Sequence, residues 1–165
     1  AWWRDMLKKP VAERPSGDAV LSGISKTWYE QTNSLRALVD AWEELLLTER
    51  LNREAAEHIA NSRASFLAEV MEAPGGIANR DYALAIASRW ALADLAAHCS
   101  QDTERKLFVE IAMEIAPEPY SLPRNLRGIV VLDALARHAL SNGGSPLASG
   151  RMAALVALRA GLLGR

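Results

Sequence analysis

Hydrophobic and polar positions along most of this chain recur with the period of an α-helix rather than the two-residue period of a strand. The longest uninterrupted pattern covers residues 79–99. Its apolar residues, spaced three or four apart, are Tyr82, Ala83, Ile86, Ala87, Trp90, Ala93 and Ala97. Leu84, Leu92 and Leu95 widen this face until little of the helix is polar, which predicts a helix surrounded by others. Asn79 is its expected N-cap.

The same period predicts seven further helices, separated by breaks rich in proline, glycine and serine. Their expected ranges are 2–9, 18–28, 35–48, 53–72, 103–115, 124–140 and 146–163. Ser16, Asn52 and Ser145 are the expected N-caps of the second, fourth and last of these. Alternating runs of β-branched residues are nearly absent. We therefore predict an all-α bundle of seven to eight helices, in which residues 1–165 form one helical domain with mostly antiparallel neighbours.

Composition narrows the class of protein. Half of the 165 residues are hydrophobic and 24% are charged, which is typical of a globular chain with a real core. The net charge of −1 gives no long-range electrostatic case for nucleic acid or an acidic membrane. The single cysteine, Cys99, excludes an internal disulfide and fits a reducing, cytoplasmic compartment. No apolar run approaches the roughly 20 residues of a membrane span.

Motifs for nucleotide binding and zinc hydrolysis are missing: there is no GxxxxGK, GxGxxG, CxxC or HExxH. His58, His98 and His138 lie on three different predicted helices, so a shared zinc site requires those helices to converge; separate histidines are the commoner outcome. Cys99 follows His98 directly, but adjacent helix residues do not face each other. We interpret Cys99 as a buried structural thiol rather than half of a reactive pair.

Acidic residues offer a second kind of candidate site. Asp40, Glu43 and Glu44 are spaced i, i+3 and i+4, so they share one helix face and are candidate ligands for Mg²⁺; the alternative is a solvated face. Asp94 lies in the apolar helix, where an unpaired carboxylate is costly. We expect Arg89 or Arg127 to pair with it, as a structural ion pair rather than as part of a ligand site.

Tryptophans are the third feature. The five, Trp2, Trp3, Trp28, Trp42 and Trp90, either line a cavity for an apolar chain or belong to the ordinary core, which is the commoner case. The last predicted helix is apolar with arginines at its edge. It either closes the bundle or lies on a bilayer, which would make the protein peripheral to a membrane.

Taken in order, several segments resemble motifs of the squalene/phytoene synthase family. The opening AWWRDML is similar to the family's RLxxWRxxL helix, which follows its first aspartate-rich motif. LVDAWEEL at 38–45, with Arg50 downstream, resembles LIDAxxxDL…R, and 54–68 resembles the helix of small residues before AGxxxxL. ASRWALADL at 87–95 resembles the helix that begins GLALQLTNILRD. Leu122-Pro123 and the basic, alanine-rich tail at 151–165 complete the resemblance.

The resemblance implies an isoprenoid-synthase-like fold whose first helices precede Ala1, because the chain opens inside a helical pattern. Active relatives condense two prenyl diphosphates, using Mg²⁺ held by two aspartate-rich motifs. Where NxxRDxxxD is expected after Leu95, this chain has AAHCSQD at 96–102, without the asparagine-arginine-aspartate set. A degraded metal site is therefore expected.

Three functions follow as expectations. The first is a divergent family member that binds a prenyl or other lipid chain without transferring it, with Trp42, Phe66, Trp90 and Asp94 as pocket candidates. The second is a helical assembly or scaffold factor that binds a protein partner, like the family's respiratory complex I assembly factors. The third is an active Mg²⁺-dependent prenyltransferase, if an upstream segment supplies the missing aspartates.

Overall fold

The computed structural model describes residues 2–72, 79–116 and 122–164. Over these residues the chain forms eight α-helices and no strand, which confirms the predicted all-α bundle. The helices are α1 (Trp2–Lys8), α2 (Ala19–Thr27), α3 (Thr32–Leu47), α4 (Arg53–Glu72), α5 (Arg80–His98), α6 (Asp102–Met113), α7 (Arg127–Ser141) and α8 (Gly150–Leu163). Two short 3-10 helices cover Val11–Glu13 and Arg124–Leu126.

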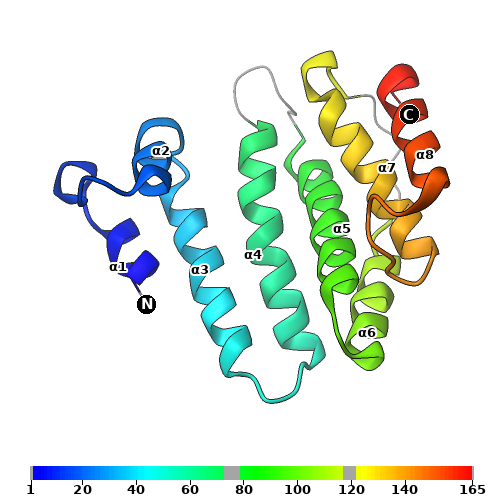
Figure 1. The fold of residues 1–165 in the computed structure, drawn as a ribbon, viewed down its shortest axis with the longest axis horizontal. Helices are drawn as coiled ribbons and strands as arrows, with labels where there is room; N and C mark the ends of the chain where they lie inside the picture. Colours follow the sequence, from blue (N-terminus) through cyan, green and yellow to red (C-terminus); the bar gives the residue numbers. More distant parts are fainter. Residues whose placement is uncertain (1, 73–78, 117–121, 165) are drawn as a thin grey trace.

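The helices pack in a row across the molecule (Figure 1). Helix α1 contacts α3, α3 contacts α4, and α4 contacts α5. Helix α5 also packs against α6 and α7, and α8 packs against α7 at the far end of the row. The prediction of a central helix is confirmed, because α5 touches neighbours on several sides. None of the described helices combines the length and apolar character needed to cross a membrane.

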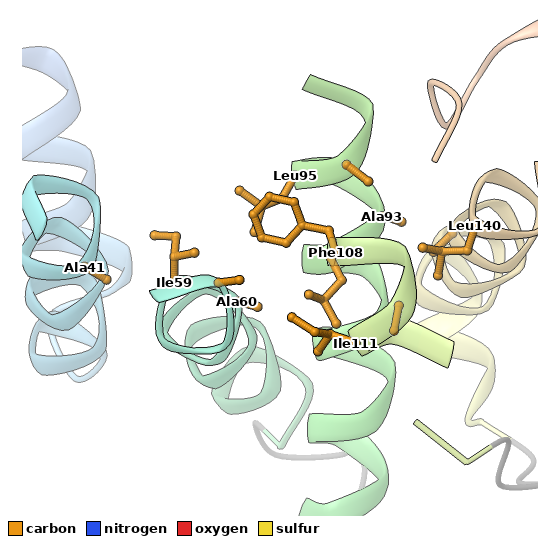
Figure 2. Close-up of a cluster of buried hydrophobic side chains, with 13 residues drawn as sticks. Ala41, Ile59, Ala60, Ala93, Leu95, Phe108, Ile111 and Leu140 are labelled. Atoms are coloured by element: carbon orange, nitrogen blue, oxygen red, sulfur yellow. The ribbon is translucent and has the colours of Figure 1, made fainter. Parts of the chain in front are cut away.

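The core lies around α5 in two clusters. The larger one joins α4, α5, α6 and α7 through residues such as Ile59, Leu95, Phe108 and Leu140 (Figure 2). The smaller one fills the other half of the α4–α5 interface, around Met71. Alanines with almost no exposed surface separate the large side chains and let the helix backbones approach closely. Each large side chain buried in this way stabilises the fold by about 1.5–3 kcal/mol.

Two of the predicted N-caps are confirmed. Asn52 accepts a hydrogen bond from the backbone of Ala55 at 2.8 Å, and Asn79 accepts one from Tyr82 at 3.1 Å. These caps satisfy amide groups that the first helical turn leaves without partners. The bounds of α4 match the prediction, and those of α5 match it to within a residue.

The other two predicted caps are wrong. Asp18, rather than Ser16, caps α2 by accepting a hydrogen bond from the backbone of Leu21 at 2.8 Å. Helix α8 begins at Gly150 instead of Pro146. The backbone of Ser149 donates to the Pro146 carbonyl, and Gly150 has a φ of 78°, so residues 146–149 form a turn that separates Ser145 from the helix.

Candidate functional site

A surface groove lies where α3, α4 and α5 meet. It has a volume of about 320 Å³ and is lined by Trp42 from α3, Arg63 from α4, and Asp94, Leu95 and His98 from α5. Asp94 and His98 are one helical turn apart, so they lie on the same side of α5. The groove therefore combines the Trp42 ring of α3 with the polar and apolar side chains of α5.

Arg63 contacts two residues of α5 at this groove. Its Nη2 atom lies 2.5 Å from Oδ2 of Asp94, and its guanidinium carbon lies 4.9 Å from the centroid of the Trp90 ring. The expectation that Arg89 or Arg127 pairs with Asp94 is wrong. Helix α4 packs along α5, so Arg63 pairs with Asp94, and the same guanidinium lies over the Trp90 ring.

Arg89 and Arg127, the two predicted partners of Asp94, pair with other groups. Arg89 is buried and donates from Nε to Oδ1 of Asp133 on α7 at 2.7 Å. Arg137 donates to the other oxygen of Asp133 at 2.8 Å, so this carboxylate is held by two arginines. Arg127 donates to the carbonyl oxygens of Gly161 and Leu162, at 3.3 and 3.2 Å, where α8 ends. This contact satisfies carbonyl groups that the helix itself leaves without donors.

A second pocket, of about 270 Å³, adjoins the groove and shares Trp42, Leu95 and His98 with it. Its remaining walls come from the end of α3, the turn into α4, and the start of α6: Leu45, Thr48, Leu51, Cys99, Ser100, Glu104 and Phe108. Leucine and phenylalanine side chains dominate the apolar walls. Each volume is close to the lower end of the range for small-molecule sites.

Cys99 lies in this second pocket but is not poised as a nucleophile. Partial burial raises the pKa of its thiol, the Glu104 carboxylate raises it further, and Arg105 opposes both. Since the thiolate is the reactive form, the raised pKa disfavours reaction at Cys99. Cys99 is only partly buried and lines a pocket, so the expectation of a buried thiol is wrong, whereas the direction of its pKa favours a structural role.

The charges in the groove nearly cancel. Asp94 neutralises Arg63, and Glu104 adds a negative charge in the adjoining pocket. His98 is mostly exposed, and its Nδ1 atom lies 2.7 Å from the Asp94 carbonyl oxygen. The Asp94 and Glu104 carboxylates would repel a ligand group with several negative charges, but they would not repel an uncharged group.

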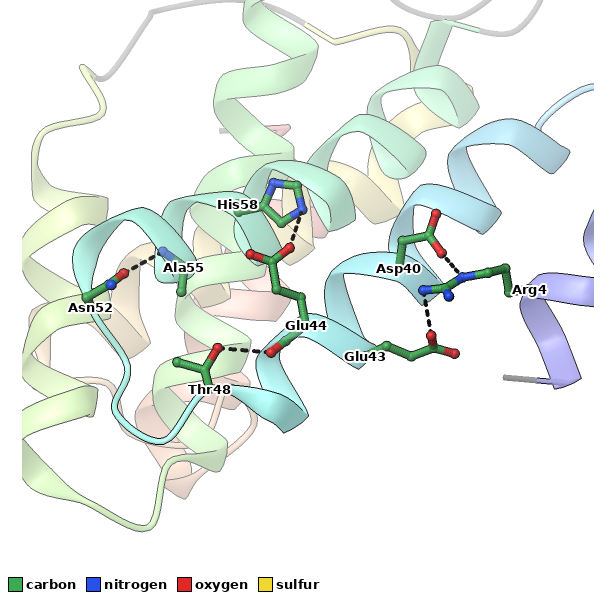
Figure 3. Close-up of polar contacts among 8 residues, drawn as sticks. All are labelled: Arg4, Asp40, Glu43, Glu44, Thr48, Asn52, Ala55 and His58. Carbon is green, nitrogen blue, oxygen red and sulfur yellow. Dashed lines mark hydrogen bonds and ion pairs between the residues drawn. The ribbon is translucent and has the colours of Figure 1, made fainter.

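The three acids proposed for Mg²⁺ are divided between two directions (Figure 3). Arg4 of α1 pairs with Asp40 and, at 2.5 Å, with Glu43. The hydrogen bond to Asp40 raises the pKa of Arg4 above its usual value. Glu44 instead faces His58 of α4, with 3.5 Å between Oε2 and Nε2.

These acids do not fit the Mg²⁺ site for which their helical spacing made them candidates. A guanidinium already lies between Asp40 and Glu43, and Glu44 points toward another helix. Within residues 2–72, 79–116 and 122–164, no three or more histidine, cysteine, aspartate and glutamate side chains are grouped so that they could hold a metal ion. The histidines also stay apart: His58 faces Glu44, His98 lies beside Asp94, and His138 contacts Asn142.

The tryptophans are less buried than an ordinary core requires. Trp28 and Trp42 are both 41% exposed, and Trp2 is more exposed still. Phe66 packs against Trp28 with ring centroids 5.0 Å apart. Of the four predicted pocket residues, Trp42 and Asp94 line the groove, Trp90 borders it through Arg63, and Phe66 contacts Trp28.

The sequence pattern did not predict Arg63 and His98 as groove residues or Phe108 as a wall of the second pocket. Arg63 and Asp94 are 31 positions apart, so no local spacing connects them. Comparison of the chain with known proteins found no matching family model, no matching curated protein and no matching solved structure. The resemblance to squalene/phytoene synthases and the isoprenoid-synthase-like assignment of the fold stay predictions.

Proposed function

We propose that this protein binds a prenyl or other lipid chain in the groove under Trp42, as a divergent squalene/phytoene synthase-like protein that does not transfer the chain. The observation that carries this proposal is the pair of adjoining volumes, about 320 and 270 Å³, between the helices of Trp42 and Trp90. Their walls are apolar at Leu45, Leu51 and Phe108. An apolar chain would bury these walls and its own surface from water.

The chemistry of the groove selects the head group. Asp94 is already paired with Arg63, and Glu104 lies at the other end. A diphosphate would therefore meet like charge, whereas an alcohol could hydrogen-bond to Asp94, His98 or Ser100. We propose a chain with an uncharged polar head. A reducing compartment such as the cytoplasm suits the free thiol of Cys99 beside this site.

Equilibrium dialysis with tritiated farnesol and with farnesyl diphosphate tests the proposal. We expect farnesol to bind more tightly than farnesyl diphosphate. The variant Trp42→Ala should weaken farnesol binding by about tenfold or more, because it removes the largest apolar wall of the groove. Trp28→Ala is the matched control, because Trp28 has the same exposed fraction and packs on Phe66 instead.

Equal losses in the two tryptophan variants would contradict the proposal, as would tighter binding of the diphosphate. A separate assay of diphosphate release from farnesyl diphosphate in the presence of Mg²⁺ addresses the transferase alternative. We expect no release, because residues 96–102, AAHCSQD, lack the asparagine-arginine-aspartate set of the second aspartate-rich motif. Turnover would show an active prenyltransferase instead.

The second candidate is a helical assembly or scaffold factor that works through protein contact. Leu46 and Leu47, one turn beyond Trp42 on α3, are at least 80% exposed. Large apolar side chains this exposed beside an aromatic residue are typical of a protein interface.

The variant Leu46→Gln/Leu47→Gln separates the two candidates. It leaves the groove walls in place, so it should not change farnesol binding. If the protein is a scaffold, a protein partner should co-purify with the native chain and be lost from the double variant. Trp42→Ala should also weaken the binding of that partner. Val20→Gln, an exposed apolar position on α2, serves as the control.

A further inference from the structure

Helix α8 turns its large apolar side chains away from the bundle. Leu155, Leu158, Leu162 and Leu163, together with Met152, are between 57% and 71% exposed. Residues 155, 158 and 162 follow the i, i+3, i+7 spacing of one helix face. We call these five residues the outer face of α8. A helix that merely closed the bundle would point this face inward.

The opposite side of α8 carries small residues. Ala153 and Ala160 are buried, and a side chain at Gly161 would touch Val131 of α7 at 3.5 Å. Helix α8 packs against α7 through these positions and lies at the end of the row of helices (Figure 1). The α7 contact therefore uses the small residues and leaves the leucines outside.

Charge is also unevenly distributed along the chain. Residues 124–165 hold six arginines and one aspartate, whereas residues 1–123 hold 13 lysines and arginines and 19 acids. The net charges of the two parts are thus +5 and −6, which the overall value of −1 conceals. The one aspartate, Asp133, is buried between Arg89 and Arg137. The outer part of α8 has Arg151 and Arg159 and no acid.

We propose that the outer face of α8 docks on an anionic lipid bilayer. The leucines would insert at the boundary of head groups and acyl chains, and Arg151 and Arg159 would reach the lipid phosphates from either side of Leu155. At 14 residues and 1.5 Å per residue, α8 is about 21 Å long, shorter than the roughly 30 Å hydrocarbon core. It therefore lies along the surface and does not cross it.

Charge complementarity selects the bilayer over a second copy of the chain. Two α8 helices packed face to face would bring four arginines together without any acid on either helix to neutralise them. An anionic lipid surface supplies the missing negative charge. A nucleic acid would also supply negative charge, but its phosphate backbone would not bury five adjacent apolar side chains. This inference is independent of the groove, which lies at the other side of α5 and α7.

Flotation of the protein with vesicles tests the proposal. We expect binding to phosphatidylcholine vesicles that contain about 30% phosphatidylglycerol, and at least tenfold weaker binding to pure phosphatidylcholine. The variant Leu155→Gln/Leu158→Gln/Leu162→Gln should lose binding to both. Arg151→Gln/Arg159→Gln should lose about tenfold or more on the anionic vesicles only, and salt should weaken the native protein in the same way.

The matched controls lie at the other end of the row. Leu46→Gln/Leu47→Gln removes exposed leucines from α3, and Lys8→Gln/Lys9→Gln removes exposed cations near α1; neither should change vesicle binding. The altered residues are exposed, so the variants should stay folded, which circular dichroism checks. The proposal is overturned if anionic vesicles are not bound, or if the leucine variant binds like the native chain. It is equally overturned if light scattering shows a dimer that the leucine variant abolishes while vesicles stay unbound.

Discussion

Helices α5 and α8 are built from the same residue types and occupy opposite environments. Both are rich in alanine and leucine. Helix α5 packs against α4, α6 and α7, so Leu92 and Leu95 are buried. Helix α8 packs against α7 and turns Leu155 and Leu158 to the outside. Apolar composition alone therefore does not decide burial in this protein; the number of neighbouring helices does.

The charged residues of the two helices also lie in different environments. Helix α5 carries Arg89 and Asp94 toward its neighbours, and each finds a partner of opposite charge on another helix, Asp133 or Arg63. The arginines of α8 stay outside with the leucines. A buried charge must be paired, whereas an exposed arginine beside apolar surface is free to contact an anionic partner.

The largest expected effect comes from the buried charge of α5. Arg89→Met should lower the free energy of unfolding by about 4 kcal/mol, because it leaves the Asp133 carboxylate buried with only Arg137 to neutralise it. Urea unfolding followed by circular dichroism measures this loss.

The double variant Arg89→Met/Asp133→Leu is the control for that prediction. Replacing both partners by apolar side chains removes the uncompensated charge, so most of the lost stability should return. If the double variant is no more stable than Arg89→Met, the loss comes from packing of the arginine stem and not from its charge.

The next effect compares equal substitutions in the two helices. Leu92→Ala should cost about 3 kcal/mol, because it opens a cavity against Phe108 and Ile111 in the larger core cluster. Leu155→Ala, on the outer face of α8, should change stability by no more than about 0.5 kcal/mol. Comparable losses would mean that Leu155 is buried in the protein as it exists in solution.

The sequence predicts α4 and α5 well because each has a long apolar pattern and an asparagine cap at its start. It does not predict which way α8 faces. Its leucines and its alanines both count as apolar, so the pattern shows no preferred side, and only the packing on α7 distinguishes them. The net charge of −1 was likewise uninformative, because the basic end and the acidic remainder cancel.

The candidate site was predicted in part for a similar reason. Trp42 and Asp94 stand out in sequence, one as a large aromatic residue and the other as a carboxylate in an apolar helix. Arg63 does not stand out, because an arginine on an amphipathic helix is usually at the surface. Its pairing with Asp94 depends on how α4 packs along α5, which is a tertiary contact between residues 31 positions apart.

An effect similar in size to that of Leu92→Ala is expected where the turn before α8 approaches α5. Gly144 has a φ of 78°, and a Cβ there would lie 2.8 Å from Cβ of Ala96. Gly144→Ala should cost about 3 kcal/mol, from strain in the left-handed backbone together with the clash. Gly143→Ala is the control, since Gly143 has a φ of 69° with open space around it and should cost about 1 kcal/mol. Equal losses of stability in the two variants would show that a Cβ at Gly144 does not clash with α5.

The smallest effect concerns the thiol where α5 ends. Burial and Glu104 raise the pKa of Cys99, so the thiolate should form at a higher pH in the folded protein than in the unfolded chain. Alkylation by iodoacetamide across pH 7–10, compared with the chain unfolded in urea, measures both titrations on the same residue. Because the folded state holds this proton more tightly, the resulting stabilisation is complete below the unfolded pKa and is lost as the pH rises through the folded pKa.

Glu104→Gln should bring the two alkylation curves closer together, whereas Arg151→Gln on α8 should leave both unchanged. An alkylation curve in the folded protein that lies below the unfolded one would mean that Cys99 is activated, and that this end of α5 is a reactive site rather than the apolar wall of a pocket.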